Sequence, residues 1–179
     1  MWLQKADACD AALIWLGSRD ERQAWDECRR GDWLLWWAVR RKVDRKLLVA
    51  AACGCARLAL PYVKGGEWRP LRAIEAAEAW YRGEATLEQV RAAADDAYTA
   101  ASYAAASAYA ANYAAYVGAH VAYAAYAGVA VVVCTYVAVA GDYAAAKSAD
   151  ADTMREKVQL RCADIVRRTI DFDCVRVHG

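Results

Sequence analysis

Apolar residues recur along most of this chain at the three- and four-residue spacing that is typical of α-helices. The clearest stripe lies between Pro70, which suits a first helical position, and Gly83, which suits a helix end. Thr86 and Gln89 then have the spacing of a capping box in front of a further long helix. The pattern predicts an all-α protein that folds as a compact multi-helix bundle.

Short helices rich in tryptophan are predicted in the first 63 residues, and three of them begin at a polar capping residue. The expected caps and helices are a capping box from Ser18 to Glu21 before a helix that ends at Gly31, Asp32 before Trp33–Arg41, and Asp44 before Arg45–Leu60.

The predicted organisation is a single helical domain over residues 1–179. Its expected parts are Trp-rich helices in 1–63, amphipathic helices in 70–97, Ala/Tyr-rich core helices in 98–146, a C-terminal helix in 150–170, and a loose or extended tail from Asp171 to Gly179. Exposed pairs Arg72/Glu75 and Glu78/Arg82 are expected on the solvated face of the helix after Pro70.

The central segment is built largely from alanine and tyrosine. Large side chains from Tyr109 to Tyr126, among them Tyr116 and His120, follow one another at steps of three and four residues. Alanines between them would let neighbouring helices approach closely while the rings fill the gaps. We expect a buried helical seam, although the β-branched run Val129–Val139 could also form a short strand.

An uncharged stretch from 113 to 141 is long enough to cross a bilayer. Its glycines and its scarcity of Leu, Ile and Phe favour a buried hairpin over a membrane span. The seven cysteines follow no secretory signal, which predicts free thiols in the reducing cytoplasm. The net charge of +1 gives no general attraction to nucleic acid.

Candidate binding residues combine arginines with aromatic rings. Arg57, on an otherwise apolar helix, is expected either to form an internal ion pair with Asp32 or Glu75 or to bind an anion in a pocket. The stretch from Trp33 to Lys46 could stack a base and hold a phosphate, or simply be a basic helix end on a solvated face. The full set of candidates is Trp33, Trp37, Arg40, Arg41, Arg57, Tyr116 and His120.

Recognisable catalytic motifs are missing from the sequence. There is no G-x-S-x-G elbow, P-loop, H-E-x-x-H helix or glycine-rich dinucleotide fingerprint. The Cys53-x-Cys55 pair lacks the usual spacing of a zinc half-site, and His120 has no potential metal ligand one turn away. We expect a protein that is not an enzyme and that carries neither metal nor cofactor.

Four blocks of sequence together resemble a family of immunity proteins linked to bacterial polymorphic toxin systems, with relatives carried by phages and prophages. They are WDECRRGDWLLWW (25–37), LLVAAACGCARLAL (47–60), RPLRAIEAAEAWYRGEATLEQVRAAADDAY (69–98) and RCADIVRRTI (161–170). The resemblance implies stoichiometric binding of a protein toxin or a host defence effector, with no family active site to transfer.

Two other functions remain open at this point. In the first, arginines and aromatic rings would line a pocket, at a homodimer interface for example, that sequesters a cyclic nucleotide or related signal as a phage counter-defence. In the second, exposed tyrosines would make the chain a self-associating helical structural protein. Thermal-shift screening and light scattering would distinguish these alternatives.

Overall fold

A computed structural model describes residues 8–58, 60–62, 66–104 and 151–176. Within these ranges every regular element is helical and no strand occurs, which confirms the all-α prediction there. The elements are α2 (Asp10–Leu16), α3 (Glu21–Glu27), α4 (Gly31–Arg40), α5 (Arg45–Arg57), the 3-10 helix η1 (Leu60–Tyr62), α6 (Arg69–Arg82), α7 (Leu87–Ala104), α10 (Ala151–Thr169) and α11 (Phe172–Arg176).

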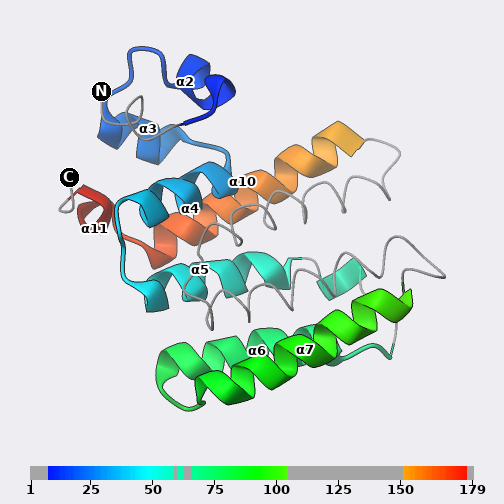
Figure 1. Cartoon of the computed structure of the whole chain (residues 1–179). Coiled ribbons are helices and arrows are strands. Elements are labelled where there is room, and N and C mark those ends of the chain that lie inside the picture. The colour runs from blue at the N-terminus through cyan, green and yellow to red at the C-terminus, as the bar shows by residue number, and fades with distance from the viewer. Residues whose placement is uncertain (1–7, 59, 63–65, 105–150, 177–179) are drawn as a thin grey trace.

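The long helix α10, near the C-terminus, completes the core that the N-terminal helices begin. α10 packs against both α4 and α5, and α5 in turn packs against α6. α6 and α7 form an antiparallel hairpin along the edge of the molecule furthest from α2 and α3 (Figure 1). The core therefore depends on contacts between segments that are far apart in the sequence.

Two glycines allow α10 to approach its neighbours closely. A Cβ atom added at Gly31 would meet the Cβ of Cys162 and would lie 2.8 Å from the backbone nitrogen of Ala163. One added at Gly54 would lie 2.7 Å from the Cγ2 methyl of Ile165. Because any larger residue would overlap with α10, these glycines fix how tightly α4 and α5 pack against it.

Several of the predicted helix ends are confirmed. Asp44 caps α5 by accepting a hydrogen bond from the backbone N–H of Lys46 at 2.8 Å. The Thr86 capping box is present, with both hydrogen bonds to Gln89 formed. Gly83 ends α6 in the left-handed region at φ +84°, where glycine has no steric penalty.

Other predicted ends are wrong by a few residues. The capping box of α3 uses Asp20 with Gln23, two residues after the expected Ser18 box. α4 begins at Gly31 with Arg30 before it, so Asp32 lies in the first turn and does not cap the helix. α5 ends at Arg57, and the backbone from 60 to 62 is a 3-10 turn.

The tail from Asp171 to Gly179 was expected to be loose or extended, and this prediction is wrong for residues 172–176. These residues form α11, in which Phe172 and Val175 are buried. The Phe172 ring lies 6.3 Å from that of Trp25, and the Arg22 guanidinium lies over it. Burial of these apolar side chains stabilises a helix that would be too short to form alone.

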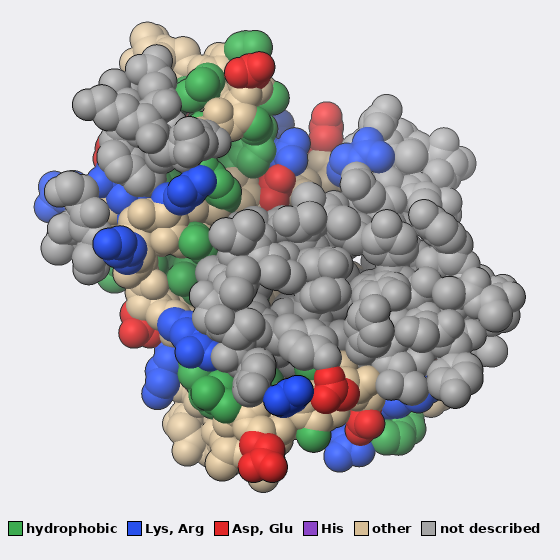
Figure 2. All heavy atoms as spheres, viewed as in Figure 1, with side chains coloured by type: hydrophobic (Ala, Val, Ile, Leu, Met, Phe, Trp, Pro, Cys, Tyr) green, Lys and Arg blue, Asp and Glu red, His purple; other side chains and the backbone are tan. Residues whose placement is uncertain are grey.

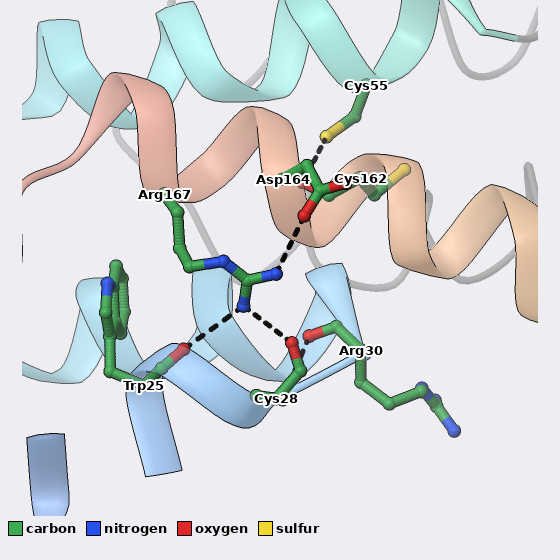
Figure 3. Close-up of polar contacts among 7 residues, drawn as sticks. All are labelled: Trp25, Cys28, Arg30, Cys55, Cys162, Asp164 and Arg167. Carbon is green, nitrogen blue, oxygen red and sulfur yellow. Dashed lines mark hydrogen bonds and ion pairs between the residues drawn. The ribbon is translucent and has the colours of Figure 1, made fainter. Parts of the chain in front are cut away.

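An arginine joins α10 to the end of α3 (Figure 3). Arg167 donates hydrogen bonds to the backbone carbonyls of Trp25 at 3.1 Å and Cys28 at 2.7 Å, and it pairs with Asp164 at 2.9 Å. Carbonyls at a helix C-terminus lack intrahelical donors, so a cation there satisfies them and complements the helix dipole. Arg167 therefore fixes α3 against the rest of the bundle.

Candidate protein-binding site

Arg57 forms an ion pair, which was one of the two alternatives predicted for it, but it does so at a partly exposed position. Its side chain is 41% exposed and makes a bidentate ion pair with Glu78 of α6, with both N–O distances at 2.7 Å. The hydrogen bond to Glu78 raises the pKa of the guanidinium further above its ordinary value. An ion pair was expected, but the partner is Glu78 and not Asp32 or Glu75.

The remaining described candidates each have a different environment. Arg41 is buried and binds both carboxylate oxygens of Glu21, at 2.7 and 2.8 Å. Trp37 is buried in the core, with its ring 5.7 Å from that of Trp25. A basic helix end on a solvated face was the other prediction for this region, and it does not hold for Arg41, whose charge is neutralised inside the fold.

Trp33 and Arg40 lie nearer the surface but are also engaged. The Trp33 ring contacts that of Trp15 edge to face at 5.9 Å, with the Arg30 guanidinium over it. Arg40 lies over the ring of Trp36. The structure thus does not assemble these candidates into one pocket. Tyr116 and His120, with the rest of the Ala/Tyr-rich seam and the Val129–Val139 run, lie outside the described residues.

A recurring arrangement of the described surface is an arginine stacked on a tryptophan. Such cation–π contacts are favourable and leave the guanidinium N–H groups able to donate hydrogen bonds. The distances from guanidinium carbon to ring centroid lie between 4.7 and 5.6 Å. The pairs are Arg19 over Trp15, Arg30 over Trp33, Arg40 over Trp36, Arg45 over Trp80 and Arg72 over Trp68.

Trp68 stands out among these rings because 52% of it is exposed. It lies in the connection before α6, and Arg72, one turn into the helix, is 4.9 Å from its ring centroid. A large exposed ring held by a cation is the kind of residue that dominates binding energy in protein interfaces. Ile14, on the seven-residue α2, is more exposed at 81%.

A groove of about 400 Å³ opens beside Trp68, between α6 and α7. Hydrophobic, basic and acidic side chains alternate along the lower edge of the molecule, where this hairpin lies (Figure 2). We call this groove with its rim the Trp68 groove. It is lined by Trp68, Arg69, Arg72, Ala76, Glu84, Ala85, Gln89, Ala92, Ala93 and Asp96.

Ion pairs neutralise most of the charge around the Trp68 groove. Arg69 binds Glu67 through Nε at 2.9 Å and Nη2 at 2.6 Å, which lowers the pKa of the Glu67 carboxyl. Arg82 binds Glu84 at 2.8 Å, which likewise lowers the pKa of that carboxyl. The predicted pairs Arg72/Glu75 and Glu78/Arg82 are therefore wrong, because Arg72 lies over Trp68, Glu78 holds Arg57 and Arg82 holds Glu84.

The Trp68 groove was not predicted from the sequence. Trp68 follows Gly66 in a connection with no helical periodicity, so no pattern showed which side of it faces water. A usable signal was nonetheless present. A tryptophan placed just before the proline-started helix at Pro70, with Arg72 four residues on, is at the correct spacing for a stack.

Four of the six described cysteines are shielded from solvent. All six are free; Cys28, Cys53, Cys55 and Cys162 are buried, whereas Cys9 is exposed. Burial raises the pKa of the Cys28 thiol to about 11 and moves that of Cys53 further upward. Thiols of this kind are poor nucleophiles, because the reactive species is the thiolate.

We expect alkylation of the native protein with iodoacetamide at pH 8 to modify Cys9 rapidly and to leave Cys28 and Cys53 unmodified. Peptide mapping by mass spectrometry before and after denaturation measures this directly. Rapid native modification of Cys28 would contradict its placement beneath α10. The raised pKa also means that Cys28 favours the folded state below pH 9, and that this contribution is lost as pH rises toward 11.

The described residues contain neither a cluster of metal ligands nor a membrane-spanning helix. No group of three or more His, Cys, Asp or Glu side chains there is arranged to hold a metal ion. No helix in the same part of the chain is long and apolar enough to span a membrane, and the uncharged stretch 113–141 lies outside it.

Comparison with known proteins supplies the family. The model of the family described as Imm-5 like putative immunity protein matches residues 39–167, which include α5, α6, α7 and most of α10. No curated protein and no solved structure matches the chain. Since the match covers well over half of the sequence, the chain belongs to the Imm-5 like immunity protein family.

Proposed function

We propose that this protein neutralises a protein toxin or defence effector by stoichiometric, non-enzymatic binding, and that the Trp68 groove makes the central contacts. The family supports an immunity role, and the groove lies inside the matched residues, whereas Ile14 lies before them. The observation that carries the choice of surface is the half-exposed Trp68 ring with Arg72 over it. Tryptophan and arginine are enriched among residues that dominate interface affinity.

The architecture suits a binding role. Trp68 is the residue immediately before α6, and the groove lies on two helices that pack against each other. Binding therefore requires little loss of conformational entropy from this protein. The alanines of the lining leave room for a partner's side chain beside the ring. A rigid surface with one large exposed anchor can bind tightly without any movement of its backbone.

The test is co-expression with candidate toxins chosen from the genes that neighbour the gene of this protein. We expect growth to be rescued, and size-exclusion chromatography with light scattering to show a complex with one copy of each protein. Trp68→Ala should weaken binding by roughly 30-fold or more, the equivalent of about 2 kcal/mol. Lys157→Ala, at an exposed position on α10, is the matched control and should bind like the wild type.

Different failures would carry different meanings. A Trp68→Ala variant with wild-type affinity would exclude the Trp68 groove as the binding surface. Inactivation of the toxin by far less than one equivalent of this protein would contradict stoichiometric inhibition. Circular dichroism of each variant shows that a loss of binding is not a loss of fold.

A further inference from the structure

The two arginines at the Trp68 groove differ in how their charge is compensated. Arg69 has Glu67 as a bidentate partner, its backbone N–H donates to the same carboxylate at 3.0 Å, and the charge of Asp96 also raises its pKa. Nothing comparable holds Arg72. Within the described residues no carboxylate forms an ion pair with it, and its contact is with the face of the Trp68 ring.

Stacking on an indole restrains a guanidinium without using its hydrogen-bonding groups. The Arg72 guanidinium carbon lies 4.9 Å from the ring centroid, in a contact that does not use the N–H donors of the group. Those donors match the two oxygens of a carboxylate, and the paired hydrogen bonds are stronger than neutral ones. The contact with Trp68 therefore positions the Arg72 guanidinium to bind a carboxylate before the partner arrives.

The rest of the Trp68 groove favours an apolar group close to that carboxylate. The exposed part of the Trp68 ring and the alanines at 76, 92 and 93 offer a surface without hydrogen-bond donors. Glu84, which lines the groove in the connection between α6 and α7, is already bound to Arg82. An aromatic or branched aliphatic side chain fits this surface, and the Arg72 carboxylate site lies directly beside it.

We infer that the Trp68 groove recognises a segment of a partner protein in which an Asp or Glu stands next to an aromatic or branched aliphatic residue. The carboxylate pairs with Arg72 and the neighbouring side chain packs on Trp68. This inference rests on the proposed function, since it names the chemistry of the partner at the same surface. It predicts that the partner is read by charge as well as by shape.

The test is selection of short random peptides displayed on phage against the immobilised full-length protein. Enriched peptides should share an acidic residue adjacent to an aromatic or branched aliphatic one. Synthetic versions should lose affinity about tenfold or more toward Arg72→Glu and toward Trp68→Ala. Lys157→Glu makes the same charge change on α10 and should leave affinity unchanged. Arg72→Lys should retain part of the binding, because it keeps the charge but not the paired donors.

The inference would be overturned by enrichment of basic peptides, by binding that Arg72→Glu leaves intact, or by the absence of any enriched peptide. These outcomes are separable from failure of the proposed function. If the Arg72→Glu variant still forms the toxin complex, the proposed immunity role stands and only the recognition of an acidic residue is refuted. Absence of any toxin complex removes the role itself, even where peptides bind.

Discussion

Replacing Trp25 by alanine should lower the free energy of unfolding by about 3–5 kcal/mol, the largest effect expected of any single change in the described core. Only 2% of Trp25 is exposed. Its ring meets that of Trp37 at 5.7 Å and that of Phe172 at 6.3 Å, so the change leaves a cavity between α3, α4 and α11. Edge-to-face ring contacts add to the loss, because they contribute beyond the buried area.

Chemical denaturation followed by circular dichroism measures this effect. Trp68→Ala is the matched control, since it deletes the same side chain at a site where half of it is already in water. We expect that control to change stability by less than about 1 kcal/mol. A Trp25→Ala variant as stable as the Trp68→Ala variant would show that the three rings do not pack together.

Replacing Gly31 by alanine should destabilise the fold by about 2–3 kcal/mol. The added methyl would overlap with the Cβ of Cys162 and with the backbone of α10 at Ala163, and backbone cannot move aside as a side chain can. α4 would have to shift away from α10. Alanine's better helix propensity offsets little, because Gly31 is the first residue of its helix.

Gly54→Ala tests the explanation within the same interface. Its added methyl would contact only the side chain of Ile165, which can rotate, and alanine is favoured inside a helix. We expect a smaller loss than at Gly31, measured as the difference in denaturation midpoints. Equal losses of stability in the two variants would contradict this explanation, because a clash with the backbone of α10 should cost more than a clash with a side chain.

Features set by local rules were predicted well from the sequence. Asp44, Gly83 and the Thr86 box act through hydrogen bonds and backbone angles within a few residues, so their positions determine their roles. The box of α3 was misplaced because Ser18–Glu21 and Asp20–Gln23 both have the correct spacing. Only the path of the chain before α3 decides between them.

Features set by tertiary packing could not be predicted in this way. α11 depends on the packing of Phe172 against Trp25. The five residues of α11 do not by themselves predict this contact. Arg57 was expected to be buried because its helix is apolar, but it lies at the end of α5, where the side chain reaches water and Glu78. Glu75, the expected partner, precedes Glu78 by almost one helical turn, so the face was nearly correct and the register was not.

The binding surface was the least predictable part. Trp33, Trp37, Arg40 and Arg41 were candidates because rings and basic groups are mixed along this stretch of the sequence. In the structure, however, Arg41 pairs with Glu21, and Trp37 packs against Trp25. These pairings neutralise or bury groups that would otherwise bind a ligand. The exposed Trp68 lies in the connection before α6, where no periodicity in the sequence shows which side of the ring faces water.

The position of α10 between α4 and α5 has a consequence for synthesis on the ribosome. The backbone N–H of Asp32 donates to the side chain of Gln159, which is translated 127 residues later. At typical elongation rates of about 5–20 residues per second, α4 waits roughly 6–25 seconds for this partner. During that interval the nascent chain exposes the apolar faces of α4 and α5 that α10 later covers, so this part of the core cannot close before α10 has been synthesised.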